Sequence, residues 1–229
     1  MARHKPFSKH RWMMSQKVEK HRLQSHHPDI PSLEKDFLDE YQPVIDALQA
    51  YLPEESHILE IGCGATCASK LIPAAKHTYL DPLLDDYRRA YPGGLPEGCY
   101  ITSMAEEIPR DDQSFDAIFC LDALTNMQNP ELVLHEVERL LKPEGTFIIS
   151  LTLWPPLLAR LFYWVASIVP ALSYQGRLYC YSRKGLINTL QRHFSITREM
   201  PLNGDRSIFF PWRKQAFLCH HRPTPSHDE

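Results

Sequence analysis

The chain lacks three features that would each indicate a particular class of protein. Its longest apolar stretch, residues 151–172, is interrupted by Pro155, Pro156 and Pro170, and the unbroken part, residues 157–169, is shorter than the roughly 20 residues that a membrane-spanning helix needs. The N-terminus has no apolar core of the length that signal peptides have. The net charge of -3 excludes a wholly basic nucleic-acid-binding protein.

The chain also lacks the closely spaced cysteine pairs of zinc sites and disulfide frameworks. Its cysteines are Cys63, Cys67, Cys99, Cys120, Cys180 and Cys219. No two of them are separated by only two residues, and most lie in or beside predicted strands. We therefore expect packed, reduced thiols, a cytoplasmic location and no metal site.

Positive charge is concentrated in an N-terminal arm that spans residues 1–32. Residues 1–27 contain seven basic residues, and their one acidic residue is Glu19. Such an arm is either solvated and frayed, to the point of disorder, or functional. A functional arm contacts RNA or anionic lipid, or folds over an active site.

Strands and helices alternate between residues 56 and 152, which predicts an α/β fold. Short apolar runs predict strands at residues 57–62, 77–81, 99–103, within 111–122, and at 146–151. Helical spacing or composition predicts helices at residues 33–52, 65–75, 82–91, 130–142 and 182–194. The expected sheet is mostly parallel, has helices on both faces, and is closed at one edge by antiparallel late strands at residues 195–200 and 214–222.

Three residues mark expected helix ends or breaks. Ser32 is a suitable N-cap for the helix at residues 33–52, and Pro43 is expected to break that helix in two. Pro82 is expected as the first residue of the helix that follows the second strand.

Glycines follow the first predicted strand, in the segment Glu60-Ile61-Gly62-Cys63-Gly64. In an open α/β sheet, ligands bind beyond the carboxyl ends of the strands, and glycine lets the backbone turn sharply and approach a ligand closely. The dinucleotide fingerprint GxGxxG fails because Cys67 stands at the third glycine position, which disfavours NAD. A turn that merely joins strand to helix is the alternative.

Aspartates end two later strands of the predicted sheet. Asp81 follows the second strand, where a carboxylate can accept two hydrogen bonds from ribose hydroxyls or cap the next helix. Asp122 follows the fourth strand, where it points into the ligand cleft or caps the strand end.

Taken in order, these segments resemble the class I methyltransferases that use S-adenosyl-L-methionine (SAM). The likeness spans residues 33–200 and is carried by HILEIGCG, YLDP, MAEEIPRDDQSFDAIFCLDAL, NPELVLHEVERLLKPEGTFIIS and YSRKGLINTLQRHF. It is closest to the type 11 and ubiquinone/menaquinone-type enzymes, which methylate small molecules. The resemblance implies a Rossmann-like fold, SAM as cofactor and a methyl-transfer activity.

The resemblance also implies roles for individual residues at the ends of four strands. The loop around the methionine part of SAM would contain Glu60, Gly62, Cys63 and Gly64. The ribose would contact Asp81 and Pro82. The adenine would lie beside Met104, Ala105 and Glu106. The methyl-transfer cleft would contain Leu121, Asp122 and Ala123, with Asp122 as the candidate catalytic residue that faces the cationic sulfur or orients a substrate.

Two positions depart from the family pattern. The family often has a third glycine where Thr66 stands, and an acidic residue for the adenine amino group where Met104 stands. Thr66 can still cap or begin a helix. Backbone contacts then become the main recognition of adenine, with Glu106 as a candidate substitute, so the departures concern affinity more than fold.

The methyltransferase domain is expected to span residues 33–222, with an apolar insertion at residues 151–181 and a disordered tail at residues 223–229. The family builds its substrate lid after the fifth strand, where this insertion stands. The insertion is then an apolar pocket wall or a peripheral membrane contact for a lipophilic substrate, or else an ordinary helix over the sheet edge.

These observations favour an enzyme that methylates a small apolar or amphipathic molecule by in-line transfer. One alternative is an RNA or protein methyltransferase, which the basic arm supports. The absence of an NPPY-like tetrapeptide disfavours nucleic acid as a partner. A second alternative, motivated by Thr66 and Met104, is a catalytically inactive binding module with a methyltransferase-like fold.

Overall fold

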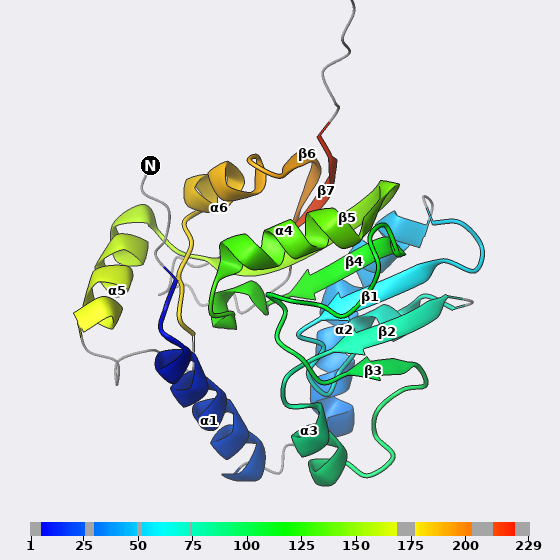
Figure 1. Ribbon diagram of the computed structural model, residues 1–229, viewed down its shortest axis with the longest axis horizontal. Helices are drawn as coiled ribbons and strands as arrows, with labels where there is room; N and C mark the ends of the chain where they lie inside the picture. Colours follow the sequence, from blue (N-terminus) through cyan, green and yellow to red (C-terminus); the bar gives the residue numbers. More distant parts are fainter. Residues whose placement is uncertain are drawn as a thin grey trace, which may run out of the picture.

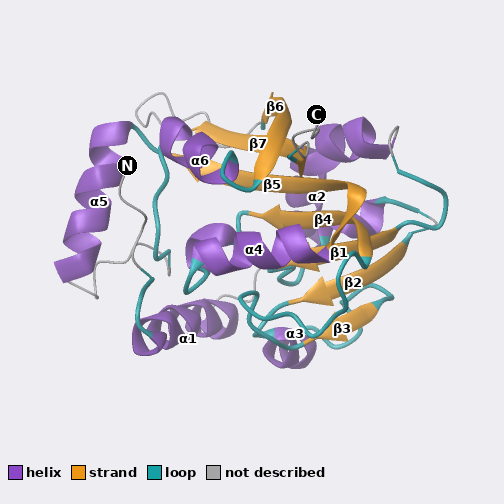
Figure 2. Ribbon diagram, turned by 45° about the horizontal axis from the view of Figure 1, so that its top comes forward, coloured by secondary structure: helices purple, strands orange, loops and turns teal. Residues whose placement is uncertain are grey.

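The computed structural model describes residues 6–25, 30–49, 52–73, 75–168, 177–202 and 213–222. Its strands form one sheet in the order β3-β2-β1-β4-β5-β7-β6 (Figures 1 and 2). Their bounds are β1 His57–Ile61, β2 Lys76–Leu80, β3 Cys99–Ile101, β4 Phe115–Leu121, β5 Leu141–Leu153, β6 Phe194–Pro201 and β7 Arg213–His221.

The sheet is parallel except at β7, which pairs antiparallel with both β5 and β6. This confirms the predicted α/β sheet with its antiparallel late strand. In register, Ile61 pairs with Leu80 and Leu80 with Ile101, so β1, β2 and β3 end together. The chain reverses its direction of progress across the sheet between β1 and β4, and such a switch point opens a crevice beyond the strand ends.

Helices cover both faces of the sheet, as Figure 1 shows. Their bounds are α1 Lys9–Ser25, α2 Ile30–Gln49, α3 Leu84–Ala90, α4 Pro130–Leu140, α5 Pro156–Ile168 and α6 Arg183–Leu190, with the short 3-10 helices η1 Ala68–Leu71 and η2 Leu124–Asn126. Residues of α4 and α6 pack on one face of the sheet, and residues of α2 and η1 pack on the other.

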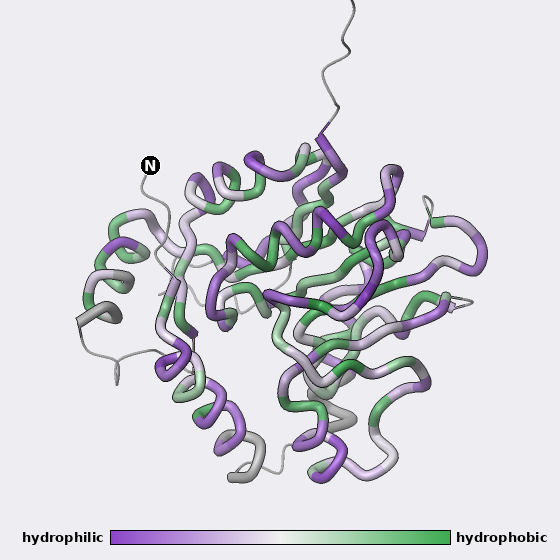
Figure 3. Tube along the Cα trace, viewed as in Figure 1, coloured by the Kyte–Doolittle hydropathy of each residue, from purple (hydrophilic) through white to green (hydrophobic). Residues whose placement is uncertain are grey.

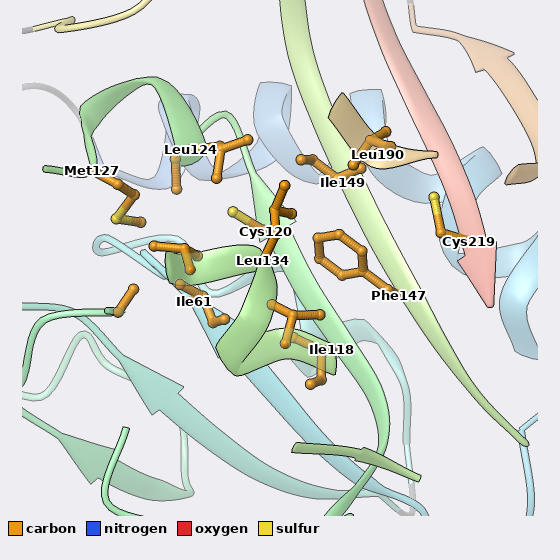
Figure 4. Packing of buried hydrophobic residues seen from close by; sticks show 14 of the residues in the cluster. Ile61, Ile118, Cys120, Leu124, Met127, Leu134, Phe147, Ile149, Leu190 and Cys219 are labelled. Atoms are coloured by element: carbon orange, nitrogen blue, oxygen red, sulfur yellow. The ribbon is translucent and has the colours of Figure 1, made fainter. Parts of the chain in front are cut away.

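The central strands are buried on both faces because successive side chains alternate between them. Ile118 and Cys120 of β4 belong to the cluster that includes Leu134 of α4 and Phe147 of β5, seen in Figure 4. Phe119, between them in the chain, belongs to the opposite cluster with the residues of α2. This two-sided burial explains why β4 is a continuous apolar run in the sequence.

The prediction for the first long helix is wrong in two details. The helix α2 begins at Ile30, before Ser32, and continues unbroken through Pro43. Tyr41, Val44 and Leu48 are fully buried against the sheet on both sides of the proline, and this packing holds the helix together. Pro43 itself is exposed, so water can satisfy the carbonyl that its missing N–H leaves unpaired.

Two other helix predictions differ from the structure where acidic side chains bind backbone amides: one α-helix is absent and the other begins two residues later. Residues 65–75 contain only the 3-10 helix η1, since the carboxylate of Glu60 accepts the amides of Ala68 and Ser69. The helix α3 begins at Leu84 and not at Pro82, and its N-cap Leu83 donates its amide to Asp81 Oδ1 at 2.8 Å. The remaining predicted elements are present, with shifted ends.

The arm and the apolar insertion both contain helices at the carboxyl edge of the parallel strands. Residues 9–25 of the arm form α1, which Figure 3 shows as mostly hydrophilic. The insertion contains α5, and the exposed fractions of Leu157, Leu161 and Trp164 are 80%, 54% and 61%. These three side chains therefore lie largely in solvent. Among the described residues, no helix is both long and apolar enough to cross a membrane. The predicted tail at residues 223–229 lies outside the described residues.

Candidate functional site

A cavity lies at the carboxyl edge of the sheet, at the switch point between β1 and β4. Ten of the twelve predicted cofactor-binding residues line it: Gly62, Gly64, Asp81, Pro82, Met104, Ala105, Glu106, Leu121, Asp122 and Ala123. These residues come from the last residue of β4 and the loops after β1, β2, β3 and β4, so the structure brings together four segments that are far apart in the sequence.

The other two predicted residues, Glu60 and Cys63, lie behind the cavity wall. The carboxylate of Glu60 accepts hydrogen bonds from Ala68 N at 3.0 Å and from Ser69 N and Oγ at 2.9 Å and 2.6 Å. Burial raises the pKa of Glu60, while these three donors lower it. Glu60 therefore fixes the loop after β1 to the strand. Cys63 is buried in a small cluster with Tyr79 and Leu84.

The two positions after β1, Gly62 and Gly64, require glycine for different structural reasons. Both have left-handed backbones, with φ of 69° at Gly62 and 56° at Gly64. A Cβ on Gly62 would lie 2.4 Å from the Cβ of Ala123, so this glycine lets the loops after β1 and β4 touch. A Cβ on Gly64 would meet no atom within 4 Å, so this glycine leaves open space at the cavity wall.

Asp81 has a buried carboxylate at the floor of the cavity. Its Oδ1 accepts Leu83 N at 2.8 Å and its Oδ2 accepts Gly64 N at 3.2 Å. Burial raises its pKa to about 6, against the lowering effect of these two amides, and the nearby Glu19 raises it further. A carboxylate has about four acceptor positions, so Asp81 retains capacity for two hydroxyl donors from a ligand.

Asp122 is held in place by a network of side chains from two other elements, α2 and β7. Its own backbone is left-handed, with φ of 54°. Its Oδ2 accepts the hydroxyl of Tyr41 at 2.9 Å and lies 2.5 Å from Lys214 Nζ, which also pairs with Glu40 at 2.6 Å. The lysine compensates the charge of Asp122, which favours positioning and electrostatic roles for this aspartate over that of a free base.

The loop after β3 contributes Met104, Ala105 and Glu106. Ala105 is almost fully buried, whereas Met104 is partly exposed. Glu106 Oε1 accepts the amide of Asn129, the N-cap of α4, at 2.9 Å. Glu106 therefore lines the cavity and also fixes the start of α4.

The helix α1 covers the cavity, and folding over an active site was one of the alternatives that the sequence left open for the arm. Its lining residues are Trp12, Ser15, Gln16 and Glu19. Their spacing of three, four and seven places them on one helix face. Because this face is mostly polar, the search for apolar periodicity misses it; the i, i+3, i+4, i+7 spacing was the available signal.

Contacts near both ends hold α1 over the sheet edge. Before its first turn, Phe7 N donates to Gln128 O at 3.2 Å, and the Phe7 and Tyr179 rings lie 4.8 Å apart. Near its C-terminal end, Lys20 Nζ lies 2.7 Å from Asp86 of α3. The arm thus connects the loop before α4 with the helix after β2.

Comparison with known proteins agrees with this geometry. Residues 59–149 match the family model for a methyltransferase domain. These residues therefore form a methyltransferase domain. The matched residues run from β1 to β5 and contain most of the cavity floor, while α1 lies outside them. No curated protein matches the sequence significantly.

Solved structures share the fold of this methyltransferase at low sequence identity. A SAM-dependent methyltransferase from Thermotoga maritima, described as a possible histamine N-methyltransferase, is 18% identical with a TM-score of 0.63, covering 91% of this chain and 100% of that one. A SAM-dependent methyltransferase from Methanosarcina mazei is 19% identical with a TM-score of 0.58, covering 78% and 97%. The [4+2]-cyclase SpnF, 15% identical with a TM-score of 0.57 over 78% and 80%, shows that one fold hosts different chemistry.

The lining of the cavity is compatible with SAM in its hydroxyl acceptors and its charge. Gly64 leaves open space beside the strand end, and Asp81 retains acceptors for hydroxyl groups. Among the described residues, the lining includes acidic side chains but no lysine, arginine or histidine. This suits a ligand with positively charged sulfur and ammonium groups, and disfavours the diphosphate of a dinucleotide.

Proposed function

We propose that this methyltransferase binds SAM in the covered cavity and methylates a small apolar or amphipathic molecule. The observation that carries the proposal is the covered arrangement of the cavity, with its floor at the ends of β1, β2 and β4 and its cover formed by α1. A site with a cover of this kind suits a small acceptor more than a folded polymer.

Each loop has a proposed part in holding the cofactor. The turn at Gly62 and Gly64 lies beside the methionine part, where the missing side chains leave room. Asp81 accepts the ribose hydroxyls. Met104 and Ala105 enclose the adenine, and Trp12 of α1 adds an aromatic surface.

The chain contributes mainly position to the methyl transfer. Bound SAM supplies a methyl group that its positively charged sulfur activates. Tyr41 and Lys214 fix the carboxylate of Asp122 at the cavity edge, where it stabilises positive charge or orients the acceptor. The α1 helix excludes water, and in-line orientation of this kind gives effective molarities of roughly 10⁵ M or more.

The proposal for an apolar acceptor is supported by α5. This helix follows the carboxyl end of β5, on the same edge as the cavity, and carries the exposed Leu157, Leu158 and Leu161. Leu121, Ala123 and Met127 add apolar surface inside the cavity. Apolar surface at both places suits a lipophilic ring or chain.

The basic arm gives less support to an RNA acceptor than its charge suggests. Lys20 pairs with Asp86 within the chain, and the guanidinium of Arg11 lies 4.4 Å from the centre of the Phe7 ring. The charge of Lys20 is therefore engaged in fastening α1 to its own domain, and that of Arg11 lies against an aromatic ring within the arm.

Titration with S-adenosylhomocysteine, the demethylated product, tests the cofactor site. We expect calorimetric binding by the wild-type protein and at least tenfold weaker binding by Asp81→Asn, which loses one of the acceptors. Asp85→Asn, an exposed neighbour on α3, is the control and should bind like wild type. A well-folded wild-type protein that fails to bind would reject the enzyme and favour the inactive binding module.

Transfer of a labelled methyl group to a panel of acceptors tests the acceptor class. The panel should contain quinone, isoprenoid and lipid-linked compounds beside small polar amines and RNA. Leu157→Glu, at a side chain that is 80% exposed, should raise KM for the apolar acceptors without changing S-adenosylhomocysteine affinity. Preferred transfer to RNA or to polar amines would contradict the proposed acceptor.

A further inference from the structure

A second group of potential ligands lies away from the cofactor cavity, between α4 and the turn that joins α6 to β6. Glu131, His135 and Glu138 share the solvent side of α4, at a spacing of four and seven residues, while Val133, Leu134 and Val137 on its other side are buried. His193 joins them from the turn, anchored by the buried Phe194 that follows it.

Both nitrogens of the His193 ring face carboxylate oxygens. Nδ1 lies 3.1 Å from Glu138 Oε2 and Nε2 lies 3.3 Å from Glu131 Oε1, and the side chain is only 5% exposed. A neutral imidazole has one N–H, so it can donate to only one of these acceptors. The other nitrogen then presents a lone pair to a carboxylate oxygen, and a metal cation placed between them would accept a lone pair from each.

The surrounding contacts match the outer partners of metal sites. Metal-binding histidines usually donate their second N–H to a carboxylate, as His193 can do to Glu138 through Nδ1. Ligating carboxylates are themselves hydrogen-bonded, and Glu131 Oε2 accepts Arg192 at 2.6 Å, which leaves Oε1 facing His193.

A third ligand is present at the right distance. One ligand atom each from Glu131, His135 and His193 lies within 4.8 Å of the others, and the His135 and His193 rings meet edge to face at 4.5 Å. Two imidazoles and a carboxylate are a ligand set of zinc and related ions, with metal–ligand distances of roughly 2.0–2.2 Å. The His135 side chain is 61% exposed, so it has room to rotate inward and leaves a path for the ion.

We propose that Glu131, His135 and His193 bind one divalent transition-metal ion of the zinc type, with Glu138 as the outer partner of His193. The ion would join α4 to the turn before β6, two segments whose paired residues lie 55 and 62 positions apart in the chain. The site is independent of the cofactor cavity, and the cysteines take no part in it.

Zinc titration of EDTA-treated full-length protein tests the proposal. By calorimetry, His135→Ala should lose one zinc equivalent relative to wild type, and Glu138→Gln should bind that equivalent roughly 10–100-fold more weakly. Zinc should also raise the thermal midpoint of wild type and leave that of His135→Ala unchanged, since only a ligand that binds the native state stabilises it.

His10→Ala is the matched control, because it removes an exposed histidine from α1 and should keep the full zinc stoichiometry. His193→Gln should abolish the same equivalent; if burial of His193 makes this variant unfold, the exposed His135 still decides the question. Equal zinc stoichiometry and affinity in wild type and His135→Ala would overturn the proposal and leave an ion-pair network only.

Discussion

The floor and the cover of the cavity are held in place by different kinds of contact. The floor consists of strand ends whose loops are tied by acidic side chains to backbone amides, as Glu60 does at Ser69 and Asp81 at Gly64. The cover, α1, is a mostly hydrophilic helix that turns Trp12 toward the cavity while Met13 and Val18 remain about half exposed.

This difference predicts separate consequences for stability and for binding. The floor is continuous with the hydrophobic core, so changes there should alter the free energy of unfolding together with cofactor affinity. The cover contacts the domain chiefly through its cavity face and its two ends, so changes there should alter affinity alone. Such weakly packed elements are the ones that open locally.

The largest effect is expected at the floor, for Gly62→Ala. The new Cβ would lie 2.4 Å from Ala123, and the backbone has a left-handed φ of 69°. Overpacking and backbone strain together should lower the free energy of unfolding by about 2–5 kcal/mol in a urea titration.

Gly64→Ala provides the matched control, because it has the same strained backbone but open space around the Cβ. Its loss should be limited to about 1–2 kcal/mol. Equal losses in the two variants would show that contact between the loops after β1 and β4 does not determine the need for glycine.

At the cover, Trp12→Ala should weaken S-adenosylhomocysteine binding about tenfold or more, since it removes a large aromatic side chain from the cavity lining. The free energy of unfolding should change much less than in Gly62→Ala. Calorimetry and urea titration of the same samples measure both quantities.

Met13→Ala is the control for this variant, because the neighbouring side chain is 48% exposed and does not line the cavity. Its affinity should equal that of wild type. If Trp12→Ala and Met13→Ala lose affinity equally, α1 acts through its helical integrity and not through its cavity face.

Between floor and cover, Asp81 faces Glu19, and its titration should couple the two regions. Its pKa is raised to about 6, chiefly by burial, so S-adenosylhomocysteine affinity should fall as the pH drops through about 6, by up to roughly tenfold per unit. Protonation would turn one oxygen of the carboxylate into a donor and so weaken its proposed hydrogen bonds to the ribose hydroxyls. Calorimetry between about pH 5 and about pH 8 measures this dependence.

Without cofactor, titration of Asp81 should make the free energy of unfolding depend on pH in the opposite direction. A raised folded-state pKa means that the native state holds the proton more tightly, so this group's contribution to unfolding free energy falls as pH rises from about 4 to about 6. Asp81→Asn should abolish both dependences, and Glu19→Gln should shift the binding midpoint to lower pH. An unchanged midpoint in Glu19→Gln would show that α1 does not influence the pKa of Asp81.

The floor was also the part of the site that sequence patterns could predict. Gly62 and Asp81 each follow an apolar run, so strand periodicity alone placed both at one sheet edge. The roles within it were less predictable: Glu60 lies in β1 itself, and its carboxylate binds η1 instead of lining the cavity. Lys214, which pairs with Asp122, comes from a strand whose place between β5 and β6 depends on tertiary pairing.

The cover was less predictable because its position depends on contacts between residues that are far apart in the sequence. Only the tertiary fold places Trp12 at the cavity. Most other apolar residues of α1 face solvent, so the spacing of apolar residues did not predict a buried helix face there. For the same reason the sequence did not predict the cluster of Glu131, His135 and His193. Its outer partner Glu138 lies 55 positions from His193 in the chain. The unbroken α2 shows the converse, since tertiary packing overrides the local preference of Pro43.

The smallest expected effect belongs to the ion pair that fastens the cover, Lys20 with Asp86. The lysine side chain is 42% exposed, and pairs of this kind contribute about 0–1 kcal/mol. Lys20→Ala should therefore weaken S-adenosylhomocysteine binding by at most about fivefold at low salt, and high salt should erase the difference. Lys17→Ala, on the same helix and without an ion pair among the described residues, controls for general charge. A large, salt-independent loss in Lys20→Ala alone would mean that α1 depends on this one contact for its position over the cavity.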